Sequence, residues 1–301
     1  MTTLAITGAT GFVGKRTVEL ALAAGHTVRA LTRRSQQPRQ GLVWVDGSLE
    51  SVDSLARLAS GADAVLHVAG VVNAPNHIGF IRGNVEGTER MLAAAESMGV
   101  QRFVMVSSLS AREPQLSNYG RSKERAESLV RKSALDWTIV RPPAVYGPGD
   151  MDMLELFKLA RRGLALLPPG GHMSAIHADD LARLLIALGE TDPGRLILEP
   201  DDGVAGGWTH EAFGRAVGDA VGKKVRAIAL PRTVMNIGAM LDGIFRRSGA
   251  RLTKDRVSYM CHPDWVVDPA KQPPVALWTP QVETRLGLKA TAEWYRANGL
   301  L

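Results

Sequence analysis

A closely spaced glycine motif follows the first apolar run of the chain. Gly8, Gly11 and Gly14 come directly after Leu4-Ala5-Ile6 and open a long amphipathic stretch. Glycines at this spacing allow a sharp turn off a strand, close approach of a pyrophosphate to the main chain and close packing of helix on strand. The order predicts a strand, a phosphate-binding loop and a helix whose N-terminus faces the phosphates. An ordinary glycine-rich turn is the alternative, and the flanking patterns favour the phosphate loop.

Strand-like and helix-like segments alternate over the first half of the chain. Apolar runs predict strands at residues 27–31, 42–45, 64–68, 102–106 and 137–140. Amphipathic stretches between them predict helices at residues 51–60, 83–98 and 119–132. This alternation is typical of an α/β fold with a doubly wound parallel sheet.

The alternation becomes irregular beyond Gly147-Pro148-Gly149. We therefore expect residues 1–150 to form a Rossmann domain that binds a dinucleotide. Residues 151–301 are expected to form mainly a smaller C-terminal α/β lobe that binds the substrate. An apolar helical pattern after Ile176-His177 predicts that residues 172–190 return to the first domain.

The composition is that of a soluble globular protein, with 45% hydrophobic and 22% charged residues among 301. The N-terminus has no signal-like pattern, and no run approaches about 18 uninterrupted apolar residues. We expect a cytoplasmic protein. Cys261 is the single cysteine of the chain, which excludes an internal disulfide and a cysteine-based zinc site.

The formal net charge of +6 raises the question of an anionic partner. Lys and Arg are spread along the chain in small groups, and aromatic residues make up only 5% of it. A platform for stacking nucleic-acid bases is therefore not expected. Part of the excess charge is available for an anionic cofactor or a lipid head group, and most of it is expected on solvated surface.

A serine, a tyrosine and a lysine follow the expected strand at 102–106 at informative spacing. Ser108 comes just after that strand, Tyr119 eleven residues later and Lys123 four residues after the tyrosine. Residues four apart share one face of a helix, and ligands of doubly wound sheets bind beyond the carboxyl ends of the strands. A tyrosine hydroxyl beside an ammonium, with a serine hydroxyl opposite, can move a proton to or from a carbonyl oxygen. An exposed helix face is the alternative, and the upstream phosphate loop favours the site.

With these motifs in place, the chain resembles a short-chain dehydrogenase/reductase of the extended or atypical branch, which includes the NAD-dependent epimerase/dehydratase family. The resemblance covers nearly the full length. The matching segments are residues 7–14, 67–70, 84–88, 107–108, 119–123, 141–149 and 177–181.

The resemblance implies roles for particular residues. Tyr119 would be the catalytic acid/base, Lys123 would orient the nicotinamide ribose and lower the tyrosine pKa, and Ser108 would hold the substrate carbonyl. Ser107 and Ser110 are alternatives for the serine role. The implied cofactor-binding residues are Thr7, Gly8, Thr10, Gly11, Phe12, Val13, Gly14, Arg33, Arg34, Ser48, Leu49, Val68, Ala69, Gly70, Asn84, Ser107, Tyr119, Lys123, Pro142, Ala144 and Val145. No metal is expected, and the resemblance makes His172 and His177 structural or substrate-loop residues.

The end of the second expected strand indicates which nicotinamide cofactor binds. An acidic residue there would hydrogen-bond the adenosine ribose, whereas this chain has Thr32 followed by Arg33 and Arg34. An arginine can grip the 2′-phosphate that an aspartate would repel. We expect NADPH/NADP+ rather than NAD in the domain at 1–150. The alternative is that both arginines are merely solvated.

The expected substrate lobe contains an apolar helical segment at residues 234–245, followed by Arg246-Arg247. Core packing of the small lobe is the favoured interpretation. A helix over an apolar pocket or at a membrane surface is the alternative, and it would make the protein peripheral at the inner face of the membrane. The methionines of this segment suit a bulky or lipidic substrate. The protein is expected as a monomer or a homodimer.

Three functions are compatible with these motifs. The first is an NADPH-dependent reductase of a ketone on a bulky substrate, with Tyr119 as proton donor. The second is an NAD-dependent sugar-nucleotide epimerase or dehydratase, against which the short link between Ser108 and Tyr119 and the presence of Arg33 weigh. The third is a non-catalytic NADP(H)-holding protein, because the chain is also similar to the Rossmann-type accessory subunit of respiratory complex I. Retention of Ser108, Tyr119 and Lys123 together favours catalysis.

Overall fold

The chain forms two compact units, and each unit is assembled from separate stretches of sequence. The computed structural model describes residues 1–246 and 252–301. Unit 1 comprises Met1–Arg141, Leu181–Glu199 and Pro273–Thr279, and unit 2 comprises Pro142–Asp180, Pro200–Gln272 and Pro280–Leu301. The labels of cofactor-binding domain and substrate lobe are functional assignments and stay predictions.

Unit 1 is built on a seven-stranded parallel sheet with the order β11-β6-β5-β4-β1-β2-β3. Its strands are β1 (Thr3–Thr7), β2 (Thr27–Thr32), β3 (Leu42–Asp46), β4 (Ala64–His67), β5 (Arg102–Val106), β6 (Asp136–Val140) and β11 (Leu196–Leu198). The sheet grows outward from β1 in both directions, so the strand order reverses between β1 and β4. Ligands of such sheets bind at this switch point, beyond the carboxyl ends of the strands.

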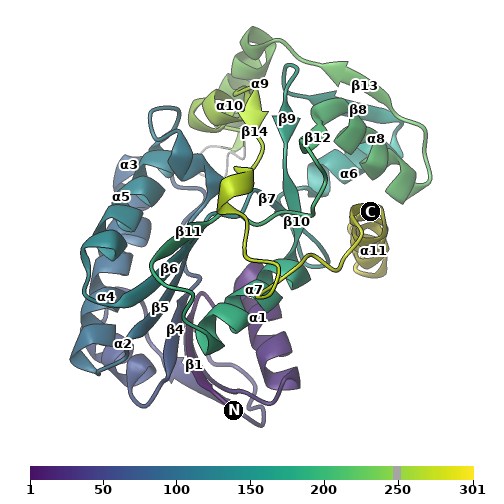
Figure 1. Ribbon diagram of the computed structural model, residues 1–301. Coiled ribbons are helices and arrows are strands. Elements are labelled where there is room, and N and C mark those ends of the chain that lie inside the picture. Colours follow the sequence, from purple (N-terminus) through teal and green to yellow (C-terminus); the bar gives the residue numbers. More distant parts are fainter. Residues whose placement is uncertain (247–251) are drawn as a thin grey trace. The chain divides into compact units, whose positions relative to one another are not determined.

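Helices cover both faces of this sheet (Figure 1). α1 and α7 lie on one face, and α2, α4 and α5 lie on the other. The helical elements are α1 (Phe12–Ala23), α2 (Val52–Ala59), α3 (His77–Phe80), the π-helix η1 (Ile81–Glu86), α4 (Gly87–Ser97), the 3-10 helix η2 (Leu109–Arg112), α5 (Asn118–Lys132) and α7 (Ala178–Glu190). The doubly wound parallel sheet predicted from the sequence is confirmed.

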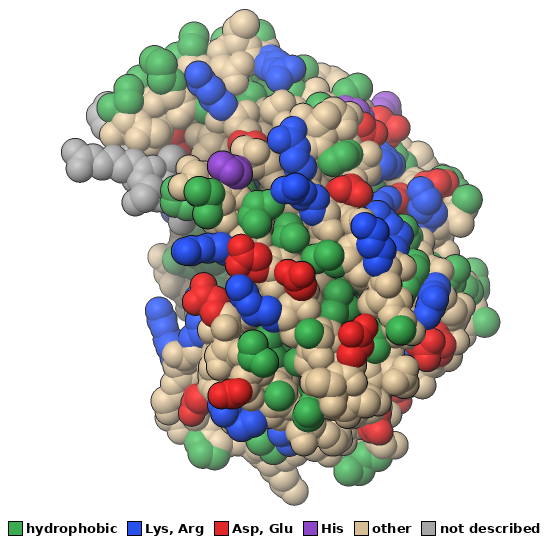
Figure 2. Space-filling view, turned by 90° about the vertical axis from the view of Figure 1, so that its left-hand side faces the viewer, with side chains coloured by type: hydrophobic (Ala, Val, Ile, Leu, Met, Phe, Trp, Pro, Cys, Tyr) green, Lys and Arg blue, Asp and Glu red, His purple; other side chains and the backbone are tan. Residues whose placement is uncertain are grey.

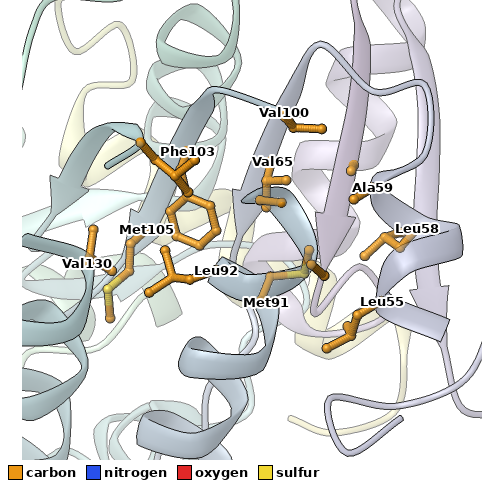
Figure 3. Packing of buried hydrophobic residues seen from close by; sticks show 14 of the residues in the cluster. Leu55, Leu58, Ala59, Val65, Met91, Leu92, Val100, Phe103, Met105 and Val130 are labelled. Atoms are coloured by element: carbon orange, nitrogen blue, oxygen red, sulfur yellow. The ribbon is translucent and has the colours of Figure 1, made fainter. Parts of the chain in front are cut away.

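A continuous apolar core joins the sheet to α2, α4 and α5 (Figure 3). Leu55 and Leu58 from α2 and Met91 from α4 are fully buried in it. The strands contribute fully buried side chains too, among them Val65, Phe103 and Met105. Each such side chain stabilises the fold by roughly 1.5–3 kcal/mol, so this core holds the strand ends in place.

Unit 2 combines helices with small sheets. Its strands are β7 (Ala144–Tyr146), β8 (Leu164–Leu167), β9 (His172–Met173), β10 (Ala175–His177), β12 (Trp208–Thr209), β13 (Arg226–Ala229) and β14 (Asp264–Trp265). Its helices are α6 (Leu154–Arg161), α8 (His210–Val221), α9 (Arg232–Arg246), α10 (Lys254–Met260), the 3-10 helix η4 (Pro269–Lys271) and α11 (Thr284–Ala297). The ring of Phe157 meets that of Tyr295 edge-on at 5.1 Å between centroids, in a core shared by α6, α8 and α11.

The apolar segment at 234–245 forms most of α9, as the periodicity predicts. Among the side chains of α9 whose burial the structure describes, residues 232–244, Met235 and Ala239 are buried, and they pack with Val257 of α10 in a small separate core. We expected the apolar side chains of this helix to pack mainly in the core of the small lobe. Among the described side chains, those on one narrow side of the helix do so, and other apolar side chains are exposed. Of the basic pair Arg246-Arg247, Arg246 ends α9 and Arg247 lies outside the described residues. No helix within the described ranges has both the length and the apolar character needed to cross a membrane.

Candidate active site

The glycine motif forms a tight loop between β1 and α1. The Gly11 amide donates to the Gly8 carbonyl at 2.9 Å, and Gly8 has a φ of +70°, in the left-handed region. A Cβ at Gly14 would lie 2.1 Å from the Gly8 oxygen, and a Cβ at Gly8 would lie 2.7 Å from the Ala69 nitrogen. Side chains at either position would push the loop away from its own backbone or from the end of β4.

The N-terminus of α1 is suited to an anion. Gly11 is its N-cap residue, no side chain caps it and its first turn contains no acidic residue. The positive end of the helix dipole is therefore left for a ligand, as in pyrophosphate-binding loops. Thr10, Phe12 and Val13 lie in this loop and first turn, so the predicted phosphate contacts come from one continuous segment. The loop fits the pyrophosphate of a dinucleotide.

The ends of β2 and β3 carry the residues predicted to meet the adenosine half of the cofactor. The Thr32 hydroxyl donates to the Arg34 carbonyl at 2.7 Å, which turns the chain after β2, and the Arg33 and Arg34 side chains are exposed. The Ser48 hydroxyl accepts from the Glu50 amide at 3.2 Å. Leu49 packs against the core of unit 1 instead of pointing into solvent.

A chain of hydrogen bonds joins the ends of β1 and β4 to the segment that follows them. His67 Nδ1 lies 2.9 Å from the Thr7 hydroxyl, and His67 Nε2 lies 3.1 Å from the Thr88 hydroxyl. The Thr7 oxygen accepts from the Ala69 amide at 3.2 Å, and the Thr88 hydroxyl donates to the Asn84 carbonyl at 2.6 Å. Because Thr88 uses its proton on Asn84, the consistent assignment places the proton of neutral His67 on Nε2.

Asn84 lies in the π-helix η1, a geometry that is rare and concentrated at functional sites. Its amide oxygen accepts from the Val71 amide at 2.7 Å, and its amide nitrogen donates to the Val71 carbonyl and to the Ser122 hydroxyl. Ser122 in turn donates to the Tyr119 carbonyl at 2.7 Å. Asn84 therefore ties the loop after β4 to the first turns of α5.

Lys123 is buried at the centre of these elements. Its ammonium donates to the Val106 carbonyl, the last residue of β5, at 2.8 Å. A Cβ at Gly70 would lie 3.4 Å from the Lys123 nitrogen and 3.3 Å from the Asn84 amide oxygen. Gly70, Asn84 and Lys123 thus lie together beyond the strand ends, and their contact with a cofactor stays a prediction.

Tyr119 and Ser108 lie on two elements that pack closely. Tyr119 is half-buried in the first turn of α5, with its ring 6.1 Å from that of Phe80. A Cβ at the next residue, Gly120, would lie only 2.6 Å from the Ser110 carbonyl oxygen, so glycine permits the approach of α5 to η2. Ser108 caps η2, and its hydroxyl oxygen accepts from the amide and hydroxyl of Ser110.

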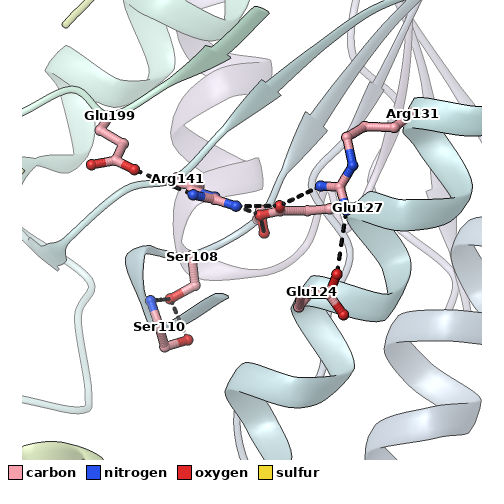
Figure 4. A network of polar contacts seen from close by, with 8 residues as sticks. Ser108, Ser110, Glu124, Glu127, Arg131, Arg141 and Glu199 are labelled. Carbon is pink, nitrogen blue, oxygen red and sulfur yellow. Dashed lines mark hydrogen bonds and ion pairs between the residues drawn. The ribbon is translucent and has the colours of Figure 1, made fainter. Parts of the chain in front are cut away.

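Ser107 contacts Glu127, which belongs to the network with Arg141 and Glu199 that is shown in Figure 4. Its hydroxyl donates to the fully buried Glu127 at 2.6 Å. The Glu127 carboxylate also receives both a 2.8 Å and a 2.6 Å hydrogen bond from the Arg141 guanidinium, which reaches Glu199 at 3.4 Å. Because the Ser107 proton is used, Ser107 can only accept a further hydrogen bond from a cofactor or substrate.

This carboxylate network was not anticipated from the sequence. Glu127 lies four residues after Lys123 and eight after Tyr119, so all three share one face of α5. An acidic residue on the buried face of the helix was the available signal. The network ties α5 to the ends of β6 and β11, and thereby holds the helix that carries Tyr119 and Lys123.

Burial changes the protonation of two groups in the site. It lowers the pKa of Lys123 to about 8, and the negative charge of Glu127 offsets part of this effect. Burial, with a smaller contribution from the Lys123 charge, lowers the pKa of His67 to about 3. His67 is therefore neutral at physiological pH and acts as a hydrogen-bonding link, whereas Lys123 titrates close to neutrality.

Three predicted contacts belong to unit 2. Pro142 begins that unit, and Ala144 and Val145 form β7, which pairs in parallel with β10. Their predicted contact with the nicotinamide stays a prediction. In the described part of the chain, no group of three or more His, Cys, Asp or Glu side chains is arranged to hold a metal ion.

Comparison with known proteins identifies the family of the chain. Residues 8–190 match a protein family described as NAD(P)H-binding. The chain is 36% identical over 311 residues to a ceramide reductase of Caulobacter vibrioides, an alignment that covers 99% of this chain and 96% of the relative. It is 28% identical over 225 residues to a 4-hydroxy-2-methyl-3-oxo-4-farnesyl-3,4-dihydroquinoline-1-oxide ketoreductase of Stigmatella aurantiaca, covering 66% of this chain and 67% of the relative.

A solved structure shares the fold. MoeE5 in complex with UDP-glucose and NAD superposes with a TM-score of 0.73, at 23% identity, over 99% of each chain. The family match and these relatives define an NAD(P)-dependent oxidoreductase, and its fold is of the Rossmann type. The chain belongs to the NAD(P)H-binding family, and it is an enzyme of the short-chain dehydrogenase/reductase type.

Proposed function

We propose that this enzyme reduces a ketone on a ceramide-like lipid, with NADPH as the reductant and Tyr119 as the proton donor. The observation that carries the proposal is the placement of Lys123, buried beside Gly70 and Asn84 and one helical turn from Tyr119. The full-length likeness to a ceramide reductase supports the reaction class and the lipid. The ketoreductase relative supports a carbonyl as the reacting group.

Each residue of the site would have a distinct role in the reaction. Bound NADPH would supply the hydride that reduces the carbonyl carbon. The Tyr119 hydroxyl would give its proton to the carbonyl oxygen, and the Lys123 ammonium would stabilise the phenolate that remains. Because Ser108 accepts both hydrogen bonds from Ser110, its own proton is available for the same carbonyl oxygen. The alcohol product then leaves, and solvent reprotonates Tyr119.

The substrate that fits this proposal is an N-acylated long-chain amino alcohol in which one hydroxyl-bearing carbon is oxidised to a ketone. The test follows NADPH absorbance with this lipid and, in parallel, conversion of UDP-glucose in the presence of NAD. We expect reduction of the lipid ketone and no epimerisation. Epimerisation of UDP-glucose without lipid reduction would replace the proposal with a sugar-nucleotide epimerase.

The role of Tyr119 is tested by Tyr119→Phe. We expect turnover to fall by about 10²- to 10⁴-fold, the usual contribution of a positioned general acid, with NADPH affinity retained. Tyr295→Phe is the matched control, because the Tyr295 hydroxyl is buried without a hydrogen-bond partner in the described structure. Turnover by Tyr119→Phe equal to that of the unchanged protein would contradict the mechanism and favour a non-catalytic dinucleotide-holding role.

The preference for NADPH rests on Arg33, supported by Arg34. Arg33 is exposed directly after β2, a strand that contains no acidic residue of its own. Loss of a charge-assisted hydrogen bond costs about 1.5–3 kcal/mol, so Arg33→Ala should weaken NADPH binding by roughly 10- to 100-fold and leave NADH binding unchanged. Lys132→Ala, an exposed cation at the far end of α5, is the control. An unchanged dissociation constant for NADPH in Arg33→Ala would overturn this assignment.

A further inference from the structure

α9 presents an apolar face that no described residue covers. Five of its apolar side chains are between 46% and 61% exposed: Val234, Ile237, Met240, Leu241 and Ile244. At 100° per residue these five side chains fall within an arc of about 120° of the helix surface. The centre of the arc lies opposite Met235 and Ala239, which attach the helix to α10. The helix is therefore held from one side and apolar on the other.

The positive charge of the chain is concentrated in the stretch of sequence that contains this helix. Residues 223–256 contain nine Lys and Arg and only two Asp and Glu, against 36 and 30 in the whole chain. The other residues therefore carry 27 basic and 28 acidic side chains, so the net charge of the protein originates in this segment. Lys223, Lys224 and Arg226 are exposed before α9, Arg232 at its start and Lys254 after it. The small groups of Lys and Arg along the chain are therefore densest in this segment.

The surface views agree with this description. At the top of Figure 2, hydrophobic side chains lie next to Lys or Arg side chains. Lower on the same face, Lys and Arg are interspersed with Asp and Glu. An apolar helix face flanked by cations is typical of helices that lie in the head-group layer of a membrane.

We infer that α9 docks the protein on an anionic lipid bilayer, with its exposed apolar face in the head-group layer and the surrounding cations on lipid phosphates. A second copy of the chain is a poorer occupant, because pairing through α9 would bring two strongly positive segments together. A nucleic acid would satisfy the cations and leave the five apolar side chains in water. A bilayer offers phosphates to the cations and also removes the apolar side chains from water. The inference rests on α9 and its charges, and it holds independently of the reaction proposed above.

The test is sedimentation of the full chain with vesicles. We expect binding to vesicles of phosphatidylcholine with phosphatidylglycerol, much weaker binding to phosphatidylcholine alone, and release at high salt because screening weakens the charge term. Two substitutions made together on the exposed face, Ile237→Glu and Ile244→Glu, should weaken binding at least tenfold. Leu286→Glu, a 66% exposed apolar residue of α11, is the matched control and should bind as the unchanged protein does.

NADPH affinity and the circular-dichroism spectrum of each variant establish that it is folded. Equal vesicle binding by the double variant and the unchanged protein would overturn the inference. A lipid-free dimer that dissociates on Ile237→Glu, measured by analytical ultracentrifugation, would assign the face to a second copy instead. Unchanged vesicle binding with lost reduction of a short, water-soluble ketone would show that α9 faces the substrate and not a membrane.

Discussion

Lys123 is the residue whose ionisation should be visible near neutral pH. Burial beside the strand ends holds its pKa near 8, below its ordinary value of 10.5. Without cofactor, we expect one lysine signal to titrate near pH 8 when the protein is labelled with ¹³C at lysine Cε and followed by NMR. Lys123→Met should remove that signal. The prediction is wrong if all lysine signals keep titrating above about pH 10, where exposed lysines do.

His67 should make the free energy of unfolding depend on pH in the acidic range. Its pKa is about 3 in the folded protein and 6.5 ordinarily, so between these values the unfolded chain binds a proton that the folded protein does not. The free energy of unfolding therefore falls as the pH decreases from about 6.5 towards 3, by up to a few kcal/mol.

The variant that checks this is His67→Gln, whose amide can still donate and accept. We expect a flatter dependence of the urea midpoint on pH in this variant than in the unchanged protein. His77→Gln, at an exposed histidine of α3, should leave the dependence as it is. An identical pH dependence in His67→Gln and the unchanged protein would rule out this role.

At the scale of elements, the turn from β1 into α1 depends on a glycine, Gly14, because there is no room for a side chain at this position. A Cβ at Gly14 would lie 2.1 Å from the Gly8 oxygen, so Gly14→Ala must move the loop or the helix. We expect a loss of roughly 1–3 kcal/mol of stability and strongly weakened NADPH binding, measured by urea unfolding and by fluorescence titration. Gly170→Ala, where a Cβ would meet nothing within 4 Å, should change neither quantity.

The attachment of α5 to the sheet depends on Glu127. Its carboxylate is fully buried and balances Arg141, whose side chain is 11% exposed. Glu127→Ala leaves the guanidinium buried without its main counter-charge, so we expect a loss of about 3–5 kcal/mol in the free energy of unfolding. Glu124→Ala removes a neighbouring carboxylate on Arg131 that is 36% exposed, and should cost about 0–1 kcal/mol. Similar losses of unfolding free energy in both variants would show that the buried network stabilises the protein no more than an exposed ion pair does.

At the scale of the whole molecule, successive segments of the chain belong alternately to unit 1 and unit 2. A fragment that ends at Asp150 lacks α7 and β11, although both belong largely to unit 1. It would lose Leu184, Leu185 and Leu188, which are fully buried on α7, and would leave β6 as an open edge. We expect this fragment to aggregate, because exposed apolar surface and an unpaired edge favour association.

A fragment of residues 1–199 is the comparison, since it keeps α7 and β11. We expect it to remain in solution more than residues 1–150 do, as measured by sedimentation after expression under the same conditions. A sharp, cooperative urea transition of the shorter fragment with the midpoint of the full chain would contradict this prediction.

Much of the architecture could be predicted because its signals are local. The alternation of apolar runs and amphipathic stretches specifies strands and helices by their periods, and the spacing of Tyr119 and Lys123 places both on one helix face. The glycine positions predict the loop between β1 and α1 for a similar reason, because the shape of this loop depends on the conformation of a few consecutive residues. The roles of these residues in cofactor binding and catalysis stay predictions.

The contacts that complete the site join residues far apart in the chain. Glu127, Arg141 and Glu199 meet only because α5, β6 and β11 pack together, and Thr7 meets His67 because β1 and β4 are neighbours in the sheet. No local pattern encodes which strand becomes whose neighbour. These partners could therefore be named only after the strand order was known.

Sequence alone determined the α/β class, the glycine loop and the helix that carries Tyr119 and Lys123, because each depends on residues within one or two turns. Tertiary structure decided which charges are buried, which hydroxyl protons remain available and that no described residue covers the apolar side of α9. An amphipathic period is the same whether its apolar face meets a core, a partner or a membrane. Burial is a property of the packed molecule, so it appears only when distant segments have been brought together.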